Sequence, residues 1–270
     1  MAERHLIALD LDGTLLKDNK TISLKTKDIL KKARAEGHIV MIATGRPYRS
    51  SEMYYHELEL DTPIVNFNGA FMHHPRKPDW GIYHEPLDVK VAKEIVDACR
   101  SFQFHNIIAE VMDDVYFHYH DEKLLDIFGL GNPRITTGDL CNFLNDSPTS
   151  LLIHTEEEEL KVIREHLAGI HAEVIEQRSW AAPWHVIEII KTGLNKAVGL
   201  KKASEYFQIP QERIIAFGDE DNDLEMIEYA GHGVAMGNAI NLLKNIANDI
   251  TLTNEEDGVG IFLADLLNLK

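Results

Sequence analysis

The stretch HLIALDLDGTLL, residues 5–16, places two aspartates directly after an apolar run and just before a glycine. The run predicts a buried strand. Because strand side chains alternate with a period of two, Asp10 and Asp12 would point the same way at its carboxyl end. A turn signal accounts for Asp12 before Gly13, but not for Asp10, which follows four apolar residues and is costly to bury without a partner. The stretch therefore predicts a ligand site where this strand of an α/β sheet ends.

The two ends of the chain share one pattern and the middle has another. Short apolar runs alternate with helical segments near both ends, which is typical of βαβ units. In the middle, the runs NIIAEVM and VYFHYH predict an antiparallel hairpin joined at Asp113 and Asp114, and the Gly, Pro and Asn content of residues 128–140 predicts a loop. We expect a doubly wound parallel-sheet core from residues 1–84 and 190–270, with residues 85–189 inserted as an α+β cap domain.

Composition limits the partners. The 270 residues carry a formal net charge of −17, which would repel nucleic acid and anionic membranes at long range. No stretch is long and apolar enough to span a bilayer, and the N-terminal run is too short for a signal peptide. Cys99 and Cys141 lie far apart, as expected of reduced thiols. We expect a cytoplasmic monomer or homodimer with no nucleic-acid or membrane partner.

Small and polar residues also follow the other core strands. They are Thr44, Gly45 and Arg46 in VMIATGR, Asn68 and Gly69 in IVNFNGA, and Asp219, Asn222 and Asp223 in IIAFGDEDND. In a parallel sheet these strand ends converge on one crevice. Clustered carboxylates repel one another unless a cation joins them, and oxygen ligands without His or Cys suit Mg²⁺, which commonly also binds a substrate phosphate. A carboxylate can attack phosphorus, but the residues alone do not decide which aspartate does so.

Four motifs then indicate a family. DLDGTLL (residues 10–16), ATGR (residues 43–46), the lysine of GLNKAVGL and GDEDND (residues 218–223) resemble, in order, the four motifs of the haloacid dehalogenase (HAD) phosphatase superfamily. The large insertion between the second and third motifs is similar to that of the Cof-type subfamily with an α/β cap. The resemblance covers the whole chain. It implies a Mg²⁺-dependent phosphomonoesterase that forms an aspartyl-phosphate intermediate on a small phosphorylated metabolite.

The resemblance also implies a role for each matching residue. Asp10 is the nucleophile, and Asp12 is the general acid and base that protonates the leaving alkoxide and then activates water. The implied Mg²⁺ ligands are Asp10, the main-chain carbonyl of Asp12, and Asp219. The implied phosphate ligands are the backbone amides near Leu11 and Gly45, together with Thr44, Lys196 and Asn222. Residues implied to act behind these ligands or on the substrate are Asp223, Arg46 and Asn68.

Two further predictions concern the lysine of the site and the aromatic residues of the cap. Lys191 lies five residues before Lys196, and Lys196 is preferred because it opens a helix, where backbone N–H groups also favour anions. Substrate choice is expected to reside in the cap, where Trp180, Trp184 and His185 precede the return to the core. An aromatic side chain there either stacks on a substrate ring or packs in the cap core, and both interpretations stay open.

The substrate class has several candidates. The stretches MYYHELELDTPIVNFNGAF and HHPRKP are similar to the riboflavin-pathway phosphatases that act on 5-amino-6-(5-phospho-D-ribitylamino)uracil, whereas other relatives accept sugar phosphates, flavin mononucleotide or pyridoxal phosphate. Sugar-phosphate mutases generally have a smaller helical cap, and a halide-displacing enzyme has little use for the acidic fourth motif. A phospho-accepting receiver module is shorter and has no inserted cap. A metabolite-sensing protein would require a disabled motif residue, and none is disabled.

Overall fold

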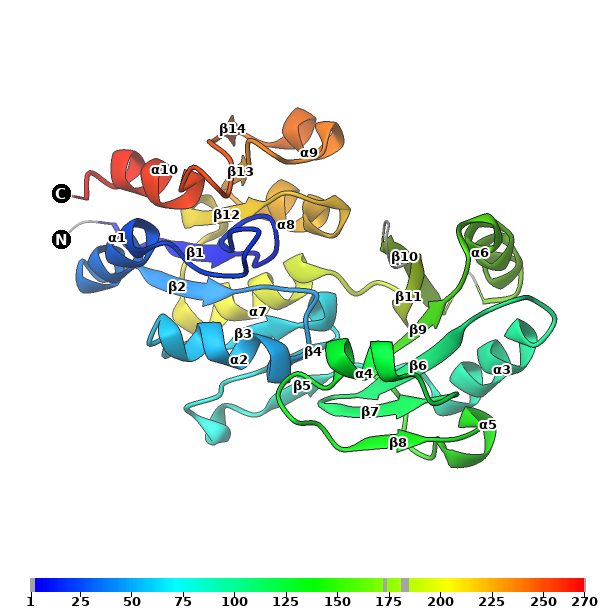
Figure 1. Ribbon diagram of the computed structural model, residues 1–270. Helices are drawn as coiled ribbons and strands as arrows, with labels where there is room; N and C mark the ends of the chain where they lie inside the picture. Colours follow the sequence, from blue (N-terminus) through cyan, green and yellow to red (C-terminus); the bar gives the residue numbers. More distant parts are fainter. Residues whose placement is uncertain (1–2, 172–173, 181–184, 270) are drawn as a thin grey trace. The chain divides into compact units, whose positions relative to one another are not determined.

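The computed structural model describes residues 3–171, 174–180 and 185–269, and contacts divide the chain into two compact units (Figure 1). The first unit comprises Met1–Arg46, Glu52–Ile82 and Asn195–Lys270, so it combines both ends of the chain. The second unit comprises Pro47–Ser51 and Tyr83–Leu194. The predicted boundaries left Pro47–Ser51 in the core. This segment groups with the second unit, where the Arg49 backbone N–H donates to Asp113 at 2.9 Å.

A five-stranded parallel sheet forms the centre of the first unit. Its order is β14-β13-β12-β1-β2. The strands are β1 (Leu6–Leu9), β2 (Ile39–Ile42), β12 (Ile214–Gly218), β13 (His232–Ala235) and β14 (Asp249–Ile250). Leu9 pairs with both Ile42 and Phe217, so the residues that follow these three strands leave the sheet at the same edge. The predicted α/β fold with a parallel core sheet is confirmed.

Helix α1 (Leu24–Ala35) has a capping residue before its start and a glycine after its end. Ser23 accepts a hydrogen bond from the Thr26 backbone N–H at 3.1 Å, and Gly37, at φ +94°, follows the last turn. The other α-helices of this unit are α7 (Lys196–Phe207), α8 (Leu224–Tyr229), α9 (Asn241–Ile246) and α10 (Gly258–Leu266), and α2 (Tyr48–Glu57) belongs to it from Glu52 onward. The short 3₁₀ helices are η1 (Phe67–Gly69), η2 (Pro78–Trp80), η3 (Gln211–Arg213) and η4 (Asp221–Asp223).

A small sheet continues the chain after α2. Its order is β3-β4-β5, with β3 (Ile64–Asn66), β4 (Phe71–His73) and β5 (Ile82–His84). β3 and β4 are antiparallel, and Ala43, just past β2, forms a parallel bridge with Val65 of β3. The bridge brings the end of β3 next to the end of β2, which places the residues of η1 beside the loop that follows β2.

The second unit is built on a six-stranded sheet of order β10-β11-β9-β6-β7-β8. Its strands are β6 (Asn106–Val111), β7 (Asp114–Phe117), β8 (Ile135–Thr137), β9 (Ser150–His154), β10 (Ile175–Trp180) and β11 (Val186–Lys191). Its helices are α3 (Val89–Cys99), α4 (Glu122–Phe128), α5 (Leu140–Phe143) and α6 (Glu157–His171). β6 and β7 form the predicted antiparallel hairpin, with Val111 opposite Asp114.

The prediction of a loop over residues 128–140 is wrong in part. Residues Ile135–Thr137 form β8, which runs parallel to β7 with Ile135 opposite Val115. The Gly, Pro and Asn residues of the segment mark its turns correctly, but a strand of three residues depends on its partner more than on its own composition. That partner lies earlier in the chain, outside the stretch from which the loop was predicted.

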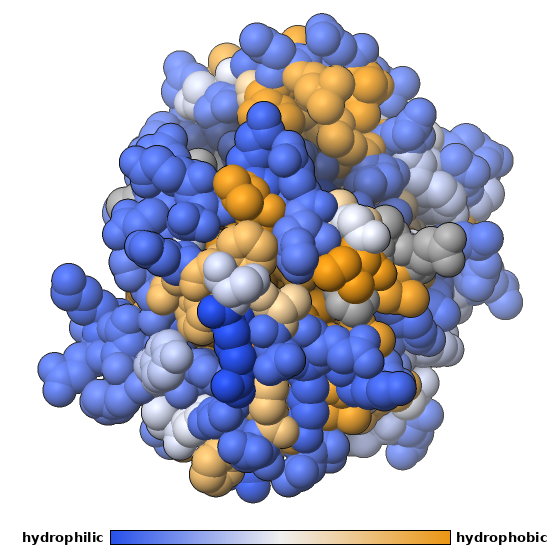
Figure 2. Space-filling view, turned by 90° about the vertical axis from the view of Figure 1, so that its right-hand side faces the viewer, coloured by the Kyte–Doolittle hydropathy of each residue, from blue (hydrophilic) through white to orange (hydrophobic). Residues whose placement is uncertain are grey.

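The surface on the face drawn in Figure 2 is mostly hydrophilic, with hydrophobic residues in separate patches. Among the described residues, no helix combines the length and the apolar character needed to cross a bilayer. Cys99 and Cys141 are both free thiols. Burial raises the pKa of the Cys99 thiol to about 12, so this side chain packs in the core of the second unit rather than reacting.

Arg49 forms a buried ion pair with Glu110 inside the second unit, and both side chains are 5% exposed. We expect Arg49→Met to lower the free energy of unfolding by about 3 kcal/mol, because Glu110 would stay buried without its counter-charge. The matched control is Arg134→Met, which removes a pair between the exposed Arg134 and Asp114 and should leave the free energy of unfolding close to the wild-type value. Urea unfolding followed by circular dichroism measures both. Equal losses in the two variants would contradict the prediction.

Candidate active site

Three carboxylates lie around one buried lysine at the edge of the parallel sheet. Lys196 Nζ donates to Asp10 Oδ1 at 2.6 Å and to Asp223 Oδ1 at 2.7 Å, and its side chain is fully buried. Asp10, Asp219 and Asp223 each offer an oxygen within 4.8 Å of the others. Asp10 follows β1 and Asp219 follows β12, its parallel neighbour, so the strand register brings them together. Leu11, next to Asp10, is fully buried.

Lys196 reaches the cluster because it begins helix α7. Asn195 caps this helix by accepting a hydrogen bond from the Val198 backbone N–H at 3.2 Å. Gly69, at φ +98°, packs so closely that a Cβ there would lie 2.3 Å from the Asn195 carbonyl oxygen. Lys191, the alternative considered from the sequence, pairs instead with Glu85 of the second unit at 2.5 Å. The structure therefore brings Lys196 to the carboxylates and engages Lys191 elsewhere.

The cluster is short of positive charge. Burial raises the pKa of Asp10, Lys196 opposes that shift, and Asp223 adds to it. Burial also raises the pKa of Asp219, with further contributions from Asp10 and Asp223. Burial would lower the pKa of Lys196, but its two carboxylate partners outweigh burial and raise it. One ammonium group thus lies among three carboxylates, and the negative charge that it does not balance favours a bound cation.

This donor set fits a hard divalent metal ion. Its oxygens are all carboxylate oxygens, the ligands that hard cations prefer. Asp219 is oriented by the Thr14 hydroxyl, which donates to Oδ1 at 2.9 Å, and by the Asn238 amide, which donates to Oδ2 at 3.4 Å. Sequence reasoning missed both residues, although Thr14 lies within the first motif. Of the carboxylates, Asp10 and Asp219 are among the metal ligands that the resemblance implies.

Asp223 fixes the loop that follows β12. Its Oδ2 accepts hydrogen bonds from the backbone N–H groups of Asp219 at 2.9 Å and Glu220 at 3.2 Å, while its Oδ1 accepts from Lys196. Glu220 and Asp223 together form a capping box at the start of η4. Asp223 therefore holds Asp219 at a set position relative to Lys196.

Asp12 has different partners. Arg46 donates from Nε to Asp12 Oδ2 at 2.6 Å and from Nη2 to Oδ1 at 2.7 Å, and Lys20 Nζ donates to Oδ1 at 2.7 Å. Burial alone would raise the pKa of Asp12, but Arg46 and Lys20 outweigh burial and lower it to about 2. Both cations therefore favour the ionised form of this carboxylate. The sequence pointed to Arg46 but not to Lys20, since a lysine in a polar loop carries no signal of its own.

The loop after β2 brings the second-motif residues next to η1 and η4. Thr44 is buried, and its hydroxyl oxygen accepts a hydrogen bond from the Arg46 backbone N–H at 3.1 Å. A Cβ at Gly45 would lie 3.2 Å from the amide of Asn68. Asn68 in turn accepts a hydrogen bond from the Asn222 amide at 3.0 Å. Thr44, Gly45, Asn68 and Asn222 therefore form one polar cluster from three separate segments of the chain, and its Thr44 and Asn68 side chains are buried.

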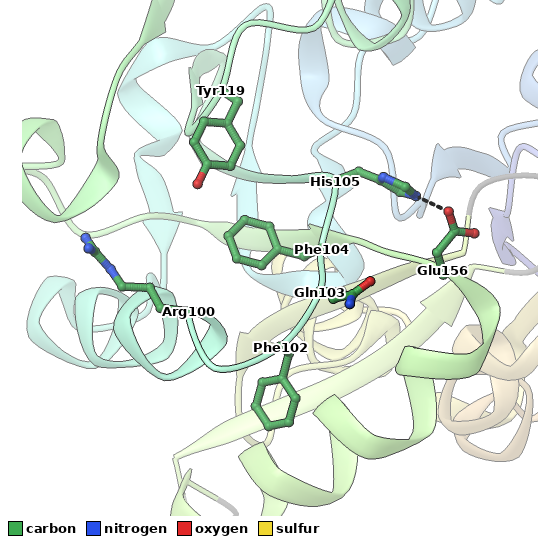
Figure 3. Close-up of a pocket in the computed structure, with 7 residues that line it drawn as sticks. All are labelled: Arg100, Phe102, Gln103, Phe104, His105, Tyr119 and Glu156. Atoms are coloured by element: carbon green, nitrogen blue, oxygen red, sulfur yellow. Dashed lines mark ion pairs between the residues drawn. The ribbon is translucent and has the colours of Figure 1, made fainter.

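The second unit contains a cavity of about 460 Å³ (Figure 3). It is lined by Arg100, Phe102, Gln103, Phe104, His105, Tyr119 and Glu156, with His105 paired to Glu156 at 3.0 Å. These lining residues include none of the predicted site residues. Of the predicted cap residues, Trp180 ends β10, Trp184 lies outside the described residues, and His185 accepts a backbone hydrogen bond from Thr155 at 3.2 Å.

Comparison with known proteins agrees with this geometry. A family model described as haloacid dehalogenase-like hydrolase matches residues 7–263. The chain belongs to the haloacid dehalogenase-like hydrolases. This hydrolase is 60% identical over 265 residues to the 5-amino-6-(5-phospho-D-ribitylamino)uracil phosphatase YitU of Bacillus subtilis, covering 98% of each chain. The family resemblance that the four motifs carry is therefore confirmed.

More distant relatives extend the comparison. The hydrolase is 28% identical to the pyridoxal phosphate phosphatase YbhA of Escherichia coli, over 96% of this chain and 97% of that protein. Its fold is similar to that of the X-ray structure of TM0651 from Thermotoga maritima, with a TM-score of 0.84 at 28% identity and 97% of each chain covered. The fold thus extends across the full chain rather than only across the motifs.

Gly13, at φ +73°, packs against the cluster, and a Cβ there would lie 2.1 Å from Asp219 Oδ2. We expect Gly13→Ala to displace the Asp219 carboxylate and to lower phosphatase activity about 100-fold, because a misplacement of about 1 Å has an effect of that size. The matched control is Gly193→Ala, at φ +77°, where no heavy atom of the described residues other than its chain neighbours lies within 4 Å of the added Cβ, and it should keep most of its activity. Phosphate release from 4-nitrophenyl phosphate measures both. Similar activities in the two variants would contradict the prediction.

Proposed function

We propose that this hydrolase is a Mg²⁺-dependent phosphomonoesterase that acts on a small phosphorylated metabolite through an aspartyl-phosphate intermediate. The observation that carries the proposal is the contact of the buried Lys196 ammonium with Asp10 and Asp223, at 2.6 and 2.7 Å, beside Asp219. Such a cluster holds a carboxylate at a strand end together with the positive charge that a phosphoryl group needs. Membership of the family and 60% identity to a protein named as a phosphatase support the same reaction.

Asp10 is the nucleophile in this proposal. Its Oδ1 accepts a hydrogen bond from Lys196, so we assign the attack on phosphorus to Oδ2. The bond from phosphorus to the leaving oxygen breaks as the aspartyl-phosphate forms, and the leaving alkoxide takes a proton from the protonated form of Asp12, which the negative charge of the bound phosphate group favours. Water then attacks the same phosphorus and gives a proton to Asp12. The bond between phosphorus and Asp10 breaks, which releases inorganic phosphate and restores the carboxylate.

The phosphoryl oxygens need several donors. We assign them to the Thr44 hydroxyl, the backbone amides near Leu11 and Gly45, the Asn222 amide and Lys196. Asp10, Asp219 and the main-chain carbonyl of Asp12 would hold Mg²⁺. The bound ion supplies positive charge that offsets the carboxylates and the phosphoryl oxygens.

Three further residues support these groups. The oxygens of Asp223 already accept hydrogen bonds from Lys196 and from two backbone N–H groups, so we assign Asp223 to holding the site rather than to direct ligation. Arg46 acts on Asp12 through its two hydrogen bonds to that carboxylate. Asn68 acts on Asn222 by accepting its amide hydrogen bond, which orients Asn222 for a phosphoryl oxygen.

We propose 5-amino-6-(5-phospho-D-ribitylamino)uracil as the substrate. YitU, which is named for that activity, is 60% identical over 98% of both chains. Pyridoxal phosphate is the second candidate, supported by YbhA at 28% identity. We also propose that residues 85–189 act as the cap that selects the leaving group, and that the enzyme works in the cytoplasm as a monomer or homodimer. The net charge of −17 and the two free thiols support that setting.

Phosphate release from a panel of esters tests the function. The panel contains the ribitylamino-uracil phosphate, pyridoxal phosphate, flavin mononucleotide and hexose phosphates, each with Mg²⁺ or with a chelator. We expect wild-type turnover that requires Mg²⁺, the highest kcat/KM for the ribitylamino-uracil phosphate, and a loss of at least about 10⁴-fold in Asp10→Asn, which lacks the nucleophile. Activity that survives in Asp10→Asn would contradict the assignment of the nucleophile. A higher kcat/KM for another ester would replace the proposed substrate.

A further inference from the structure

The Asp12 carboxylate is held by two cations from different loops. Arg46 binds both of its oxygens, and Lys20 binds Oδ1, so three N–H groups meet one carboxylate. The Asp12 side chain is 43% exposed, and contacts between exposed charges are individually weak because water and side-chain motion compete with them. Whether the carboxylate keeps one orientation therefore depends on what holds the two cations.

Tyr54 of α2 contacts both of them. Its hydroxyl donates a hydrogen bond to the Lys20 carbonyl oxygen at 3.0 Å, and the Arg46 guanidinium carbon lies 5.5 Å from the centre of its ring. That distance is within the range of a cation–π interaction. Tyr54 is only 2% exposed, so packing fixes the ring and the hydroxyl. A single buried side chain is thus in contact with both residues that bind Asp12.

The loop that carries Lys20 is itself closed by hydrogen bonds. Lys20 has φ +62°, and its backbone N–H donates to the Lys17 carbonyl at 2.8 Å. The Lys17 backbone N–H donates in turn to the Thr21 carbonyl at 3.0 Å. With the Tyr54 hydroxyl on the Lys20 carbonyl, the main chain of Lys20 is held on both sides. Only its side chain needs ordering to reach Asp12, which reduces the entropy lost in making the contact.

We propose that Tyr54, acting through Lys20 and Arg46, is a positioning residue that holds the carboxylate of Asp12 in the orientation needed for proton transfer to the leaving group. The inference rests on the proposed acid and base role of Asp12 and adds Tyr54 and Lys20, to which neither the sequence motifs nor the family match assigns a role. General acid catalysis depends on geometry first, because the proton has to be within hydrogen-bond reach of the leaving oxygen.

Comparing two kinds of ester separates an effect on the orientation of the acid from an effect on binding of the phosphoryl group. An alkyl phosphate releases an alkoxide that needs a proton, whereas 4-nitrophenyl phosphate releases a phenolate that is stable without one. The ratio kcat/KM reports the steps up to departure of the leaving group and excludes later hydrolysis of the aspartyl-phosphate. We expect Lys20→Met to lower kcat/KM about tenfold for the alkyl ester and less than about twofold for the aryl ester, as a partial loss of acid catalysis requires.

Two further variants and two controls complete the experiment. Tyr54→Phe keeps the ring and removes the hydroxyl, so it should also lower kcat/KM more for the alkyl ester than for the aryl ester, but by a smaller factor than Lys20→Met. Lys20→Arg keeps the positive charge and should retain most of the wild-type activity on the alkyl ester. Tyr55→Phe removes a hydroxyl bonded to Thr62, and Lys27→Met removes a lysine paired with Glu57. Neither control contacts Lys20, Arg46 or Asp12 in any hydrogen bond or ion pair that the structure records, and neither should change the ratio of the two esters.

Equal decreases in kcat/KM for the two esters in Lys20→Met would overturn the inference, because they would indicate that Lys20 binds the phosphoryl group directly. An unchanged or increased kcat/KM for the alkyl ester in Lys20→Met would overturn the inference as well. Both results differ from failure of the proposed function, in which the wild type releases no phosphate or Asp10→Asn stays active.

Discussion

The structure of the site depends on one buried ammonium group. Lys196 binds Asp10 and Asp223, which come from segments far apart in the chain, and its side chain is fully buried. Without this cation, buried carboxylates would face one another unpaired, and an uncompensated buried charge lowers stability by several kcal/mol. The parallel register of β1 and β12, the start of α7 and the loop held by Asp223 all act to bring these groups together. The fold and the chemistry therefore share a single electrostatic constraint.

Much of this arrangement could be predicted from the sequence, because its causes are local. Apolar runs that end in Asp10, Thr44 and Asp219 indicate strand ends, and a parallel sheet places such ends on one edge. Its place at a helix start favours Lys196 over Lys191, and in the structure Lys196 binds the carboxylates. The roles assigned to these residues came from the family resemblance, and the geometry is compatible with them.

Other parts of the site and the fold could not be predicted from the sequence, because they depend on contacts between distant segments that have ordinary compositions. Lys20 reads as a solvated loop lysine and Tyr54 as a core aromatic, until folding brings both to the neighbourhood of Asp12. The strand Ile135–Thr137 is defined by its pairing with β7, and Pro47–Ser51 joins the second unit through the contacts of Arg49. In each case a partner elsewhere in the chain decides the outcome, and local propensity does not reveal that partner.

The most direct test of this account compares Lys196→Met with Lys191→Met for Mg²⁺-dependent phosphate release from the ribitylamino-uracil phosphate, with circular dichroism of the same samples to report the fold. The account predicts that Lys196→Met loses about 10³-fold in kcat, because the nucleophile and the phosphoryl group lose their shared positive charge. It predicts that Lys191→Met, which removes only an exposed pair with Glu85, stays close to wild type. Turnover by Lys196→Met within about tenfold of wild type would contradict the account.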